Sequence, residues 1–128
     1  EGGNSYLGFS ALDEEGDDVT DMILTTPRLM MFTSHDMTGI TSEEWEEMAE
    51  LINEAGKKGY YVIWVTATTP DEVETLRETH PCLEEVYYGD ELEIKTIVRF
   101  NPGLILLDEG RVVNKWSAID FDKVWDRI

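Results

Sequence analysis

Two apolar runs of strand type, each followed by an amphipathic helical pattern, most constrain how this chain can fold. Residues 29–33 form a continuous apolar run, and residues 60–66 are almost entirely aromatic or β-branched, as in strands buried on both faces of a sheet. Each run leads into a helix that opens with a capping pattern, at Thr41–Glu44 and at Thr69–Glu72. Strands that alternate with helices in this way predict a mainly parallel sheet, because parallel strands need a crossover connection.

Weaker patterns complete one alternating order, in which three β-α units are followed by a short strand, a helix, two strands and a last helix. The two late strands flank Asp108-Glu109-Gly110, which is typical of a type I turn followed by a left-handed glycine, so we predict a β-hairpin. Before the first buried run we predict a strand over 7–12 and a helix over 20–24 with Thr20 as its N-cap. After the second run we predict a short strand over 86–88 and a helix after Asp90 that holds Leu92, Ile94, Ile97 and Val98. The hairpin strands cover 104–107 and 111–116, and a final helix holds Phe121, Val124 and Trp125.

The composition suits one folded domain and excludes several classes of function. The 128 residues are 41% hydrophobic, which is enough for a core, and they contain no internal repeat or linker. The formal net charge of −18 opposes binding to nucleic acids and to anionic lipid headgroups. Cys82 is the only cysteine, so an intramolecular disulfide, a CxxC redox pair and a cysteine-rich zinc site are excluded. We expect no cofactor and no bound metal.

The segment from Arg99 to Trp116 carries the most specific motif of the chain. It reads Arg-Phe-Asn-Pro-Gly, continues as an apolar strand, and turns through Asp-Glu-Gly into a second strand. Together with the alternating order before it, this segment resembles the cis-proline strand and glycine hairpin of the thioredoxin fold, and the resemblance covers nearly the whole chain. It implies one α/β thioredoxin-like domain over residues 1–128, with a central mixed sheet of about five strands, helices on both faces and a cis peptide bond before Pro102.

A narrower likeness joins this region to the C-terminal soluble domain of bacterial DoxX-like membrane proteins. It rests on Leu92, Lys95, Thr96, Arg99, Asn101 and Trp116-Ser117. The likeness implies that the chain is excised from a longer protein and lies at the periplasmic face of the inner membrane, attached to the membrane only through a tether outside this segment. The implied partner is a protein or peptide of unknown identity.

The sequence departs from thioredoxins at the positions that carry their chemistry. When residues 32–34 are aligned on the first central strand, Met37 and Ile40 stand where the family has its two CxxC cysteines, and Met31 stands where it has a buried acid. Only the cis-proline platform remains, which in the family aligns extended substrate backbone. The resemblance therefore implies a redox-inactive module that binds protein or peptide. Its expected binding surface is the former active-site rim, which comprises Ser34, His35, Asp36, Met37, Thr38, Gly39, Ile40, Asn101 and Pro102, with Lys95 and Arg99 nearby.

Cys82 supports an alternative from a different class, a single-cysteine thiol oxidoreductase or peroxidase. A reactive thiol needs positive surroundings, whereas Glu84 and Glu85 follow closely and would raise the pKa of this thiol. A lone cysteine is ordinarily a small hydrophobic side chain. We therefore prefer the non-catalytic interpretation and keep the thiol enzyme as the alternative.

Three other clusters have simple structural interpretations. Ser34-His35-Asp36 has the residue types of a catalytic triad, but consecutive side chains on an extended segment point to alternating sides. The acidic segment 13–18 has its glycine at the fourth position, whereas an EF-hand loop needs it at the sixth. Lys95 and Arg99 are four residues apart on one predicted helix face, where they either balance the acidic surface or form an anion contact beside Pro102.

The acidic residues are unevenly distributed along the chain. Residues 1–93 hold 23 of the 28 acidic residues and four of the ten basic ones, whereas residues 94–128 hold five acidic and six basic residues. We therefore expect the near-neutral C-terminal third to supply the contact surface, while the acidic remainder keeps the domain soluble.

Overall fold

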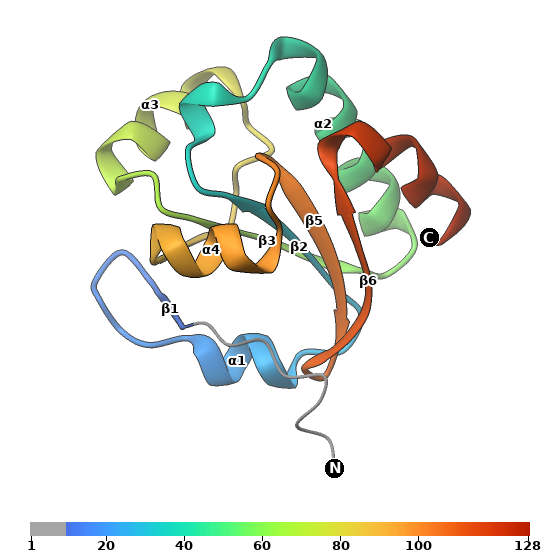
Figure 1. The fold of residues 1–128 in the computed structure, drawn as a ribbon, viewed down its shortest axis with the longest axis horizontal. Coiled ribbons are helices and arrows are strands. Elements are labelled where there is room, and N and C mark those ends of the chain that lie inside the picture. The colour runs from blue at the N-terminus through green and yellow to red at the C-terminus, as the bar shows by residue number, and fades with distance from the viewer. Residues whose placement is uncertain (1–9) are drawn as a thin grey trace.

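The computed structural model of the chain describes residues 10–128 as a mixed sheet with helices on both faces (Figure 1). Of the strand predicted over 7–12, residues 7–9 lie outside the described part. The elements in chain order are β1 (Ala11–Leu12), α1 (Thr20–Thr25), β2 (Leu29–Ser34), the 3₁₀ turn η2 (Met37–Gly39), α2 (Ser42–Lys57), β3 (Tyr61–Thr66), α3 (Pro70–Thr79), β4 (Val86–Gly89), α4 (Glu91–Ile97), β5 (Gly103–Asp108), β6 (Arg111–Ser117) and the 3₁₀ helix η3 (Ala118–Asp126).

The sheet has six strands in the order β1-β4-β3-β2-β5-β6, rather than about five. The edge strand β1 lies within the strand predicted over 7–12, and in it Ala11 pairs with Gly89 and Leu12 with Tyr88. Strands β2, β3 and β4 run parallel, while β5 and β6 form the predicted antiparallel hairpin beside β2. The two strands predicted to be central, β2 and β3, are indeed the two middle strands.

Each face of the sheet has its own hydrophobic core. On one face, α2, α3 and η3 cover a cluster rich in aromatic side chains, in which the ring of Phe32 stacks on Trp64 at 4.8 Å and Trp45 of α2 lies 5.6 Å from Trp64. On the other face, α1 and α4 cover a cluster of mostly aliphatic side chains, including Ile63 and Ile105. Both faces are therefore buried, which explains why β2 and β5 are apolar almost throughout.

The main capping predictions are confirmed. Thr41 and Glu44 form a complete capping box at the start of α2. The Thr69 side chain accepts from the Glu72 amide, Pro70 is the first residue of α3, and that helix ends at Thr79 as predicted. No helix within residues 10–128 combines the length and hydrophobicity that a membrane crossing needs.

The prediction for Thr20 is wrong. Val19 occupies the N-cap position of α1 and makes no side-chain capping bond. The Thr20 hydroxyl instead accepts a hydrogen bond from the Ala11 amide at 2.9 Å, while the Asp18 carboxylate accepts from the Thr20 amide. Thr20 therefore joins α1 to the edge strand β1, a role that only the tertiary fold creates.

Two further details differ from the sequence prediction. The hairpin turn has both Glu109 (φ 52°) and Gly110 (φ 86°) in the left-handed region, so it is a type I′ turn rather than a type I turn. The last helix is 3₁₀ rather than α, and it buries Phe121 and Val124 but leaves Trp125 exposed. Leu92 in α4 is likewise exposed instead of packing against the sheet.

Candidate functional site

Asn101 holds together the rim, which we define as residues 34–40 with Asn101 and Pro102. It precedes β5, and its peptide bond to Pro102 is cis. The Asn101 side-chain oxygen accepts from the Ser34 hydroxyl, and its amide nitrogen donates to the Asp36 carbonyl at 2.6 Å. The structure therefore brings together the two segments of the predicted rim, 34–40 and 101–102, although they lie far apart in the sequence.

The positions aligned with the CxxC motif are filled by buried apolar side chains. Met37 is fully buried at the start of η2, and Ile40 is 8% exposed. The Met37 amide donates to the Thr68 hydroxyl at 2.9 Å, so this turn is also fixed to the segment after β3. Because neither side chain is a thiol, the turn has no group that could perform dithiol–disulfide exchange.

The exposed polar residues Asp36 and Thr38 of the rim are bonded to each other. The Asp36 carboxylate accepts from both the hydroxyl and the amide of Thr38, at 2.6 and 3.0 Å. The side-chain hydrogen bond from Thr38 lowers the pKa of Asp36 below its usual value, so this carboxylate is ionised at neutral pH. The Nδ1 atom of His35 is buried without a hydrogen-bond partner, and Ser34 is bonded to Asn101 instead of His35. Ser34, His35 and Asp36 therefore do not form a catalytic triad.

Four buried polar side chains gather beneath the rim, where β2 and β3 end. These are all the buried polar residues within 10–128, namely Thr33, Ser34, Thr66 and Thr68. The Thr66 hydroxyl donates to the Ser34 carbonyl at 2.6 Å and lies 2.8 Å from the Thr68 hydroxyl. This cluster was not predicted from the sequence. The recurrence of threonine at 66, 68 and 69 directly after a buried strand was the available signal.

Lys95 and Arg99 do not share a helix face, contrary to prediction. Helix α4 ends at Ile97, and Val98 is already extended, so Arg99 lies beyond the helix. Lys95 pairs with Glu91 at 3.1 Å on the helix surface. The shared helix face on which the alternative of a joint anion contact rested is therefore absent, because α4 ends two residues before Arg99.

Two large apolar side chains beside Pro102 were not predicted to be part of the site. Phe100 is 63% exposed and stands two residues before Pro102 in the chain. Ile119 is 83% exposed, and it is held near because the adjacent Ala118 amide donates to the Pro102 carbonyl at 3.1 Å. Apolar residues are ordinarily assigned to a core, so only the tertiary structure shows them at the surface.

Cys82 lies in a separate small pocket of about 250 Å³, formed with the N-terminal half of α2. The pocket also contains the ring of His80, which stacks flat on Trp45 at 4.0 Å. Burial raises the pKa of the Cys82 thiol and lowers that of His80, and the Glu84 charge adds to the effect on the thiol. At neutral pH the pocket therefore holds a protonated thiol, which is a poor nucleophile.

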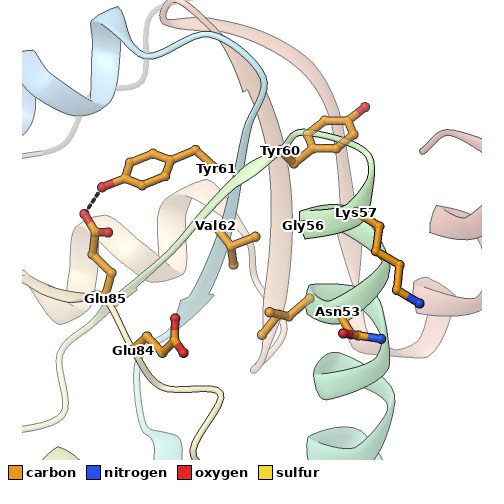
Figure 2. Close-up of a pocket in the computed structure, with 9 residues that line it drawn as sticks. Asn53, Gly56, Lys57, Tyr60, Tyr61, Val62, Glu84 and Glu85 are labelled. Atoms are coloured by element: carbon orange, nitrogen blue, oxygen red, sulfur yellow. Dashed lines mark hydrogen bonds between the residues drawn. The ribbon is translucent and has the colours of Figure 1, made fainter.

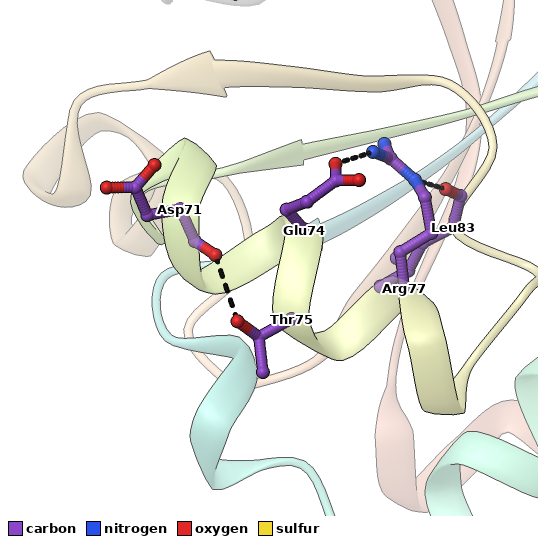
Figure 3. A network of polar contacts seen from close by, with 5 residues as sticks. All are labelled: Asp71, Glu74, Thr75, Arg77 and Leu83. Atoms are coloured by element: carbon purple, nitrogen blue, oxygen red, sulfur yellow. Dashed lines mark hydrogen bonds and ion pairs between the residues drawn. The ribbon is translucent and has the colours of Figure 1, made fainter.

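The loop that carries Cys82 is fixed by Arg77 at the end of α3 (Figure 3). The Arg77 guanidinium donates through Nε to the Leu83 carbonyl at 2.5 Å and forms an ion pair with Glu74 at 2.7 Å. Leu83 is fully buried in the aromatic core. The loop is therefore anchored on both sides of Cys82, by Arg77 and by the buried Leu83.

The acidic segment 13–18 forms an ordered turn. The Asp13 carboxylate accepts from the amides of Glu15 and Asp17, both at 2.9 Å. Within residues 10–128, no three potential metal-ligating side chains come together. The carboxylate of Asp13 therefore stabilises backbone in this turn.

Comparisons with known proteins were made on both sequence and structure. No protein-family model matches the chain, and no curated protein matches it. Among solved structures, it is similar to a protein of Chlorobium tepidum named as a thiol:disulfide interchange protein DsbE (TM-score 0.72, 14% identity, 96% of this chain and 92% of that chain covered). It is also similar to a thiol peroxidase from Chromobacterium violaceum (TM-score 0.63, 14% identity, 95% and 83% covered) and to the exposed lipoprotein thioredoxin Etrx1 of Streptococcus pneumoniae (TM-score 0.60, 13% identity, 94% and 98% covered).

The fold class that these structures share is the thioredoxin-like fold, and the chain has this fold. Its six-stranded mixed sheet and its helices on both faces agree with the class, as the sequence analysis predicted. At 13 to 14% identity the likeness extends to the fold alone, so the activities of these proteins do not transfer by similarity.

Proposed function

We propose that this thioredoxin-like domain is redox-inactive and binds an extended segment of a partner protein at its rim. The observation that carries the proposal is the replacement of both CxxC positions by the buried side chains of Met37 and Ile40. A domain with this turn keeps the scaffold of the family without its dithiol chemistry. The function left to the rim is then recognition.

The surroundings of Pro102 support a protein partner. Phe100 stands two residues before Pro102, and Ile119 follows Ala118, whose amide bonds to the Pro102 carbonyl. Exposed apolar side chains that gather on a surface commonly mark interaction sites. Phosphate-bearing ligands are disfavoured by the net charge of −18. An extended peptide with apolar side chains fits the site, because its side chains can cover Phe100 and Ile119 while its backbone bonds to exposed peptide groups.

The same proposal includes the setting of the domain. We infer that it is the soluble, periplasmic part of a DoxX-like membrane protein, on the strength of the likeness over residues 92–117. The similarity to a lipoprotein thioredoxin that is described as exposed is compatible with this setting. The test is to express the full reading frame with a reporter fused at Ile128. We expect a reporter that works only in the periplasm to be active, and a reporter that works only in the cytoplasm to be inactive.

Peptide selection tests the rim as the binding surface. Peptides are selected from a random phage-displayed library against the wild-type domain, and their affinities are then measured for Phe100→Ser and Ile119→Ser. Each variant is expected to weaken binding by about tenfold, because it removes apolar contact area worth about 1.4 kcal/mol. Leu92→Ser is the matched control, since Leu92 is 73% exposed on α4 and ten residues before Pro102 in the chain. Selected peptides that bind Phe100→Ser and Ile119→Ser as tightly as they bind Leu92→Ser would contradict the proposal.

A thiol enzyme that uses Cys82 is the second candidate function. The observation that favours it is the pocket of about 250 Å³ in which Cys82 lies with His80, together with the similarity of the fold to a thiol peroxidase. The raised pKa of the thiol argues against it. Assays of peroxide consumption and insulin reduction decide between the thiol enzyme and the redox-inactive domain. Activity of the wild type that is lost in Cys82→Ser would show that the domain is a thiol enzyme.

A further inference from the structure

A second concave site lies at the opposite end of the sheet from the rim (Figure 2). It has a volume of about 540 Å³ and lies between the C-terminal half of α2, the start of β3 and the two residues that precede β4. Because β2 and β3 are parallel and the rim is at their carboxyl ends, this site at the amino end of β3 is separate from it. We refer to it as the groove. Its lining includes Ile52, Gly56, Lys57, Val62, Glu84 and Glu85.

The apolar part of the groove is formed by α2 and β3. Ile52 and Val62 are half-buried side chains that pack against the aromatic core. Gly56 lies on the α2 side, where an added Cβ would meet nothing within 4 Å. A glycine inside a helix costs about 1 kcal/mol relative to alanine. Here it leaves the space beside Ile52 open.

The acidic part of the groove contains two carboxylates in different states. The Glu85 carboxylate accepts from the hydroxyls of Tyr61 on β3 and Tyr87 on β4, so it is already paired. Glu84 is exposed at the mouth of the groove, and its carboxylate makes no hydrogen bond or ion pair with the side chains or backbone of residues 10–128. In Figure 2 it turns toward α2 across the groove, while the amine of Lys57 points away from it.

We propose that the groove binds a lysine or arginine side chain of a partner polypeptide. The aliphatic stem of such a side chain can cover Ile52 and Val62, and its charged end can reach the Glu84 carboxylate. Glu85 serves a positioning role, because its bonds to two tyrosine hydroxyls fix the loop that carries Glu84. The acidic surface of the domain attracts basic segments over a longer range.

A peptide titration followed by NMR tests the site. The probe is a capped octapeptide of alternating glycine and lysine, and the control peptide has every lysine acetylated at its side-chain nitrogen. Binding of the first peptide is expected to shift the backbone amide signals of Ile52, Gly56 and Val62, while the acetylated peptide shifts none of them. Shifts spread evenly over the acidic surface, or no shifts at all, would overturn the proposal.

Two charge-matched variants separate specific binding from general attraction. Glu84→Gln is expected to weaken binding of the lysine peptide by about fivefold or more, because it removes the negative charge of the group that accepts from the lysine amine. Glu78→Gln on the exposed surface of α3 changes the net charge equally and is expected to leave the affinity within about twofold. Equal losses in both variants would overturn the proposal.

A third variant tests the shape of the groove without changing its charge. Gly56→Leu places a side chain in the open space next to Ile52 and is expected to abolish the amide shifts. Its thermal unfolding shows whether the fold is retained. Binding by a folded Gly56→Leu protein at wild-type affinity would overturn the proposal, and none of these results depends on whether the rim binds a partner.

Discussion

The rim and the groove lie at opposite ends of the same parallel strands, and their polar groups differ in state. At the rim, the side-chain amide of Asn101 is bonded to Ser34 and Asp36, and the hydroxyls of Thr66 and Thr68 contact each other. In the groove, the exposed Glu84 carboxylate turns toward an apolar wall and has no partner among residues 10–128. These bonded groups of the rim therefore stabilise the loops that form it, whereas the groove offers a charge to a ligand. Four predictions test this difference.

Gly103→Ala is expected to have the largest effect, since Gly103 begins β5 directly behind Pro102. An added Cβ would clash with Cγ1 of Val98 and lie 2.9 Å from the Thr33 hydroxyl oxygen. Such overpacking destabilises a core by about 3 kcal/mol. Urea denaturation measures the loss as a lower midpoint with an unchanged m-value.

Gly39→Ala is the control within the rim. Its Cβ would meet only the Asn101 side-chain nitrogen, at 3.4 Å, so we expect a change below about 0.5 kcal/mol. If Gly103→Ala were as stable as Gly39→Ala, the start of β5 would not be packed as closely against Val98 and Thr33 as described.

Thr66→Val is expected to have the next largest effect. The variant keeps the side-chain volume but removes the hydroxyl that contacts the Ser34 carbonyl and the Thr68 hydroxyl. Leaving these buried groups without a partner costs about 2 kcal/mol in the free energy of unfolding. Thr75→Val is the matched control, because the Thr75 hydroxyl donates to the Asp71 carbonyl on the exposed side of α3 (Figure 3). Equal losses in the two variants would show that the buried cluster adds nothing.

Gly56→Ala is expected to stabilise the domain by about 0.5–1 kcal/mol, since alanine favours the helix and the added Cβ meets open space. Thermal or urea unfolding measures the gain. Gly59→Ala is the opposite control, because Gly59 has φ 88° and an alanine there is strained. If Gly56→Ala were less stable than the wild type, the space beside Gly56 in the groove would not be open.

Titration of Tyr61 tests the paired carboxylate of the groove, with a small effect on stability. Burial first, and then the hydrogen bond to Glu85, raise the pKa of Tyr61 to about 12 from the ordinary 10.0. The stabilisation linked to this shift is therefore complete below pH 10 and is lost as the pH rises from 10 to about 12. Absorbance at 295 nm, compared between wild type and Tyr61→Phe, follows the ionisation.

Glu85→Gln sharpens the same titration. It removes the carboxylate but leaves the burial, so the pKa of Tyr61 is expected to fall while staying above its ordinary value. An unchanged titration in Glu85→Gln would mean that Tyr61 and Glu85 are not paired in solution, and the groove would lose the contact that fixes its acidic wall.

Much of the fold followed from local patterns in the sequence. The apolar run at 29–33 and the capping sequence at Thr41–Glu44 depend on neighbouring residues, and both gave the correct element. Patterns that depend on distant contacts were less reliable. Thr20 was assigned to a cap although it bonds to Ala11, and Trp125 was grouped with Phe121 and Val124 in the last helix although it alone of the three is exposed.

The candidate site likewise has parts that the sequence predicted and parts that it did not. Residues 34–40 and 101–102 were assigned to one rim through resemblance to a fold, and the structure joins them through Asn101. The exposed position of Phe100 was not predictable, because a phenylalanine beside a strand is ordinarily part of the core. The groove left no pattern in the sequence, since its lining residues come from three separate segments.

The sequence by itself determined the order of the elements, the alternation that requires parallel strands, and the absence of a second cysteine. These properties depend on residue types and short spacings. Only the tertiary structure decided which polar groups find partners. Asn101 meets Ser34 across 67 positions of the chain, while the Glu84 carboxylate meets none within the described residues. Hydrogen bonding and burial depend on distances in space, and the packing of the two cores sets those distances.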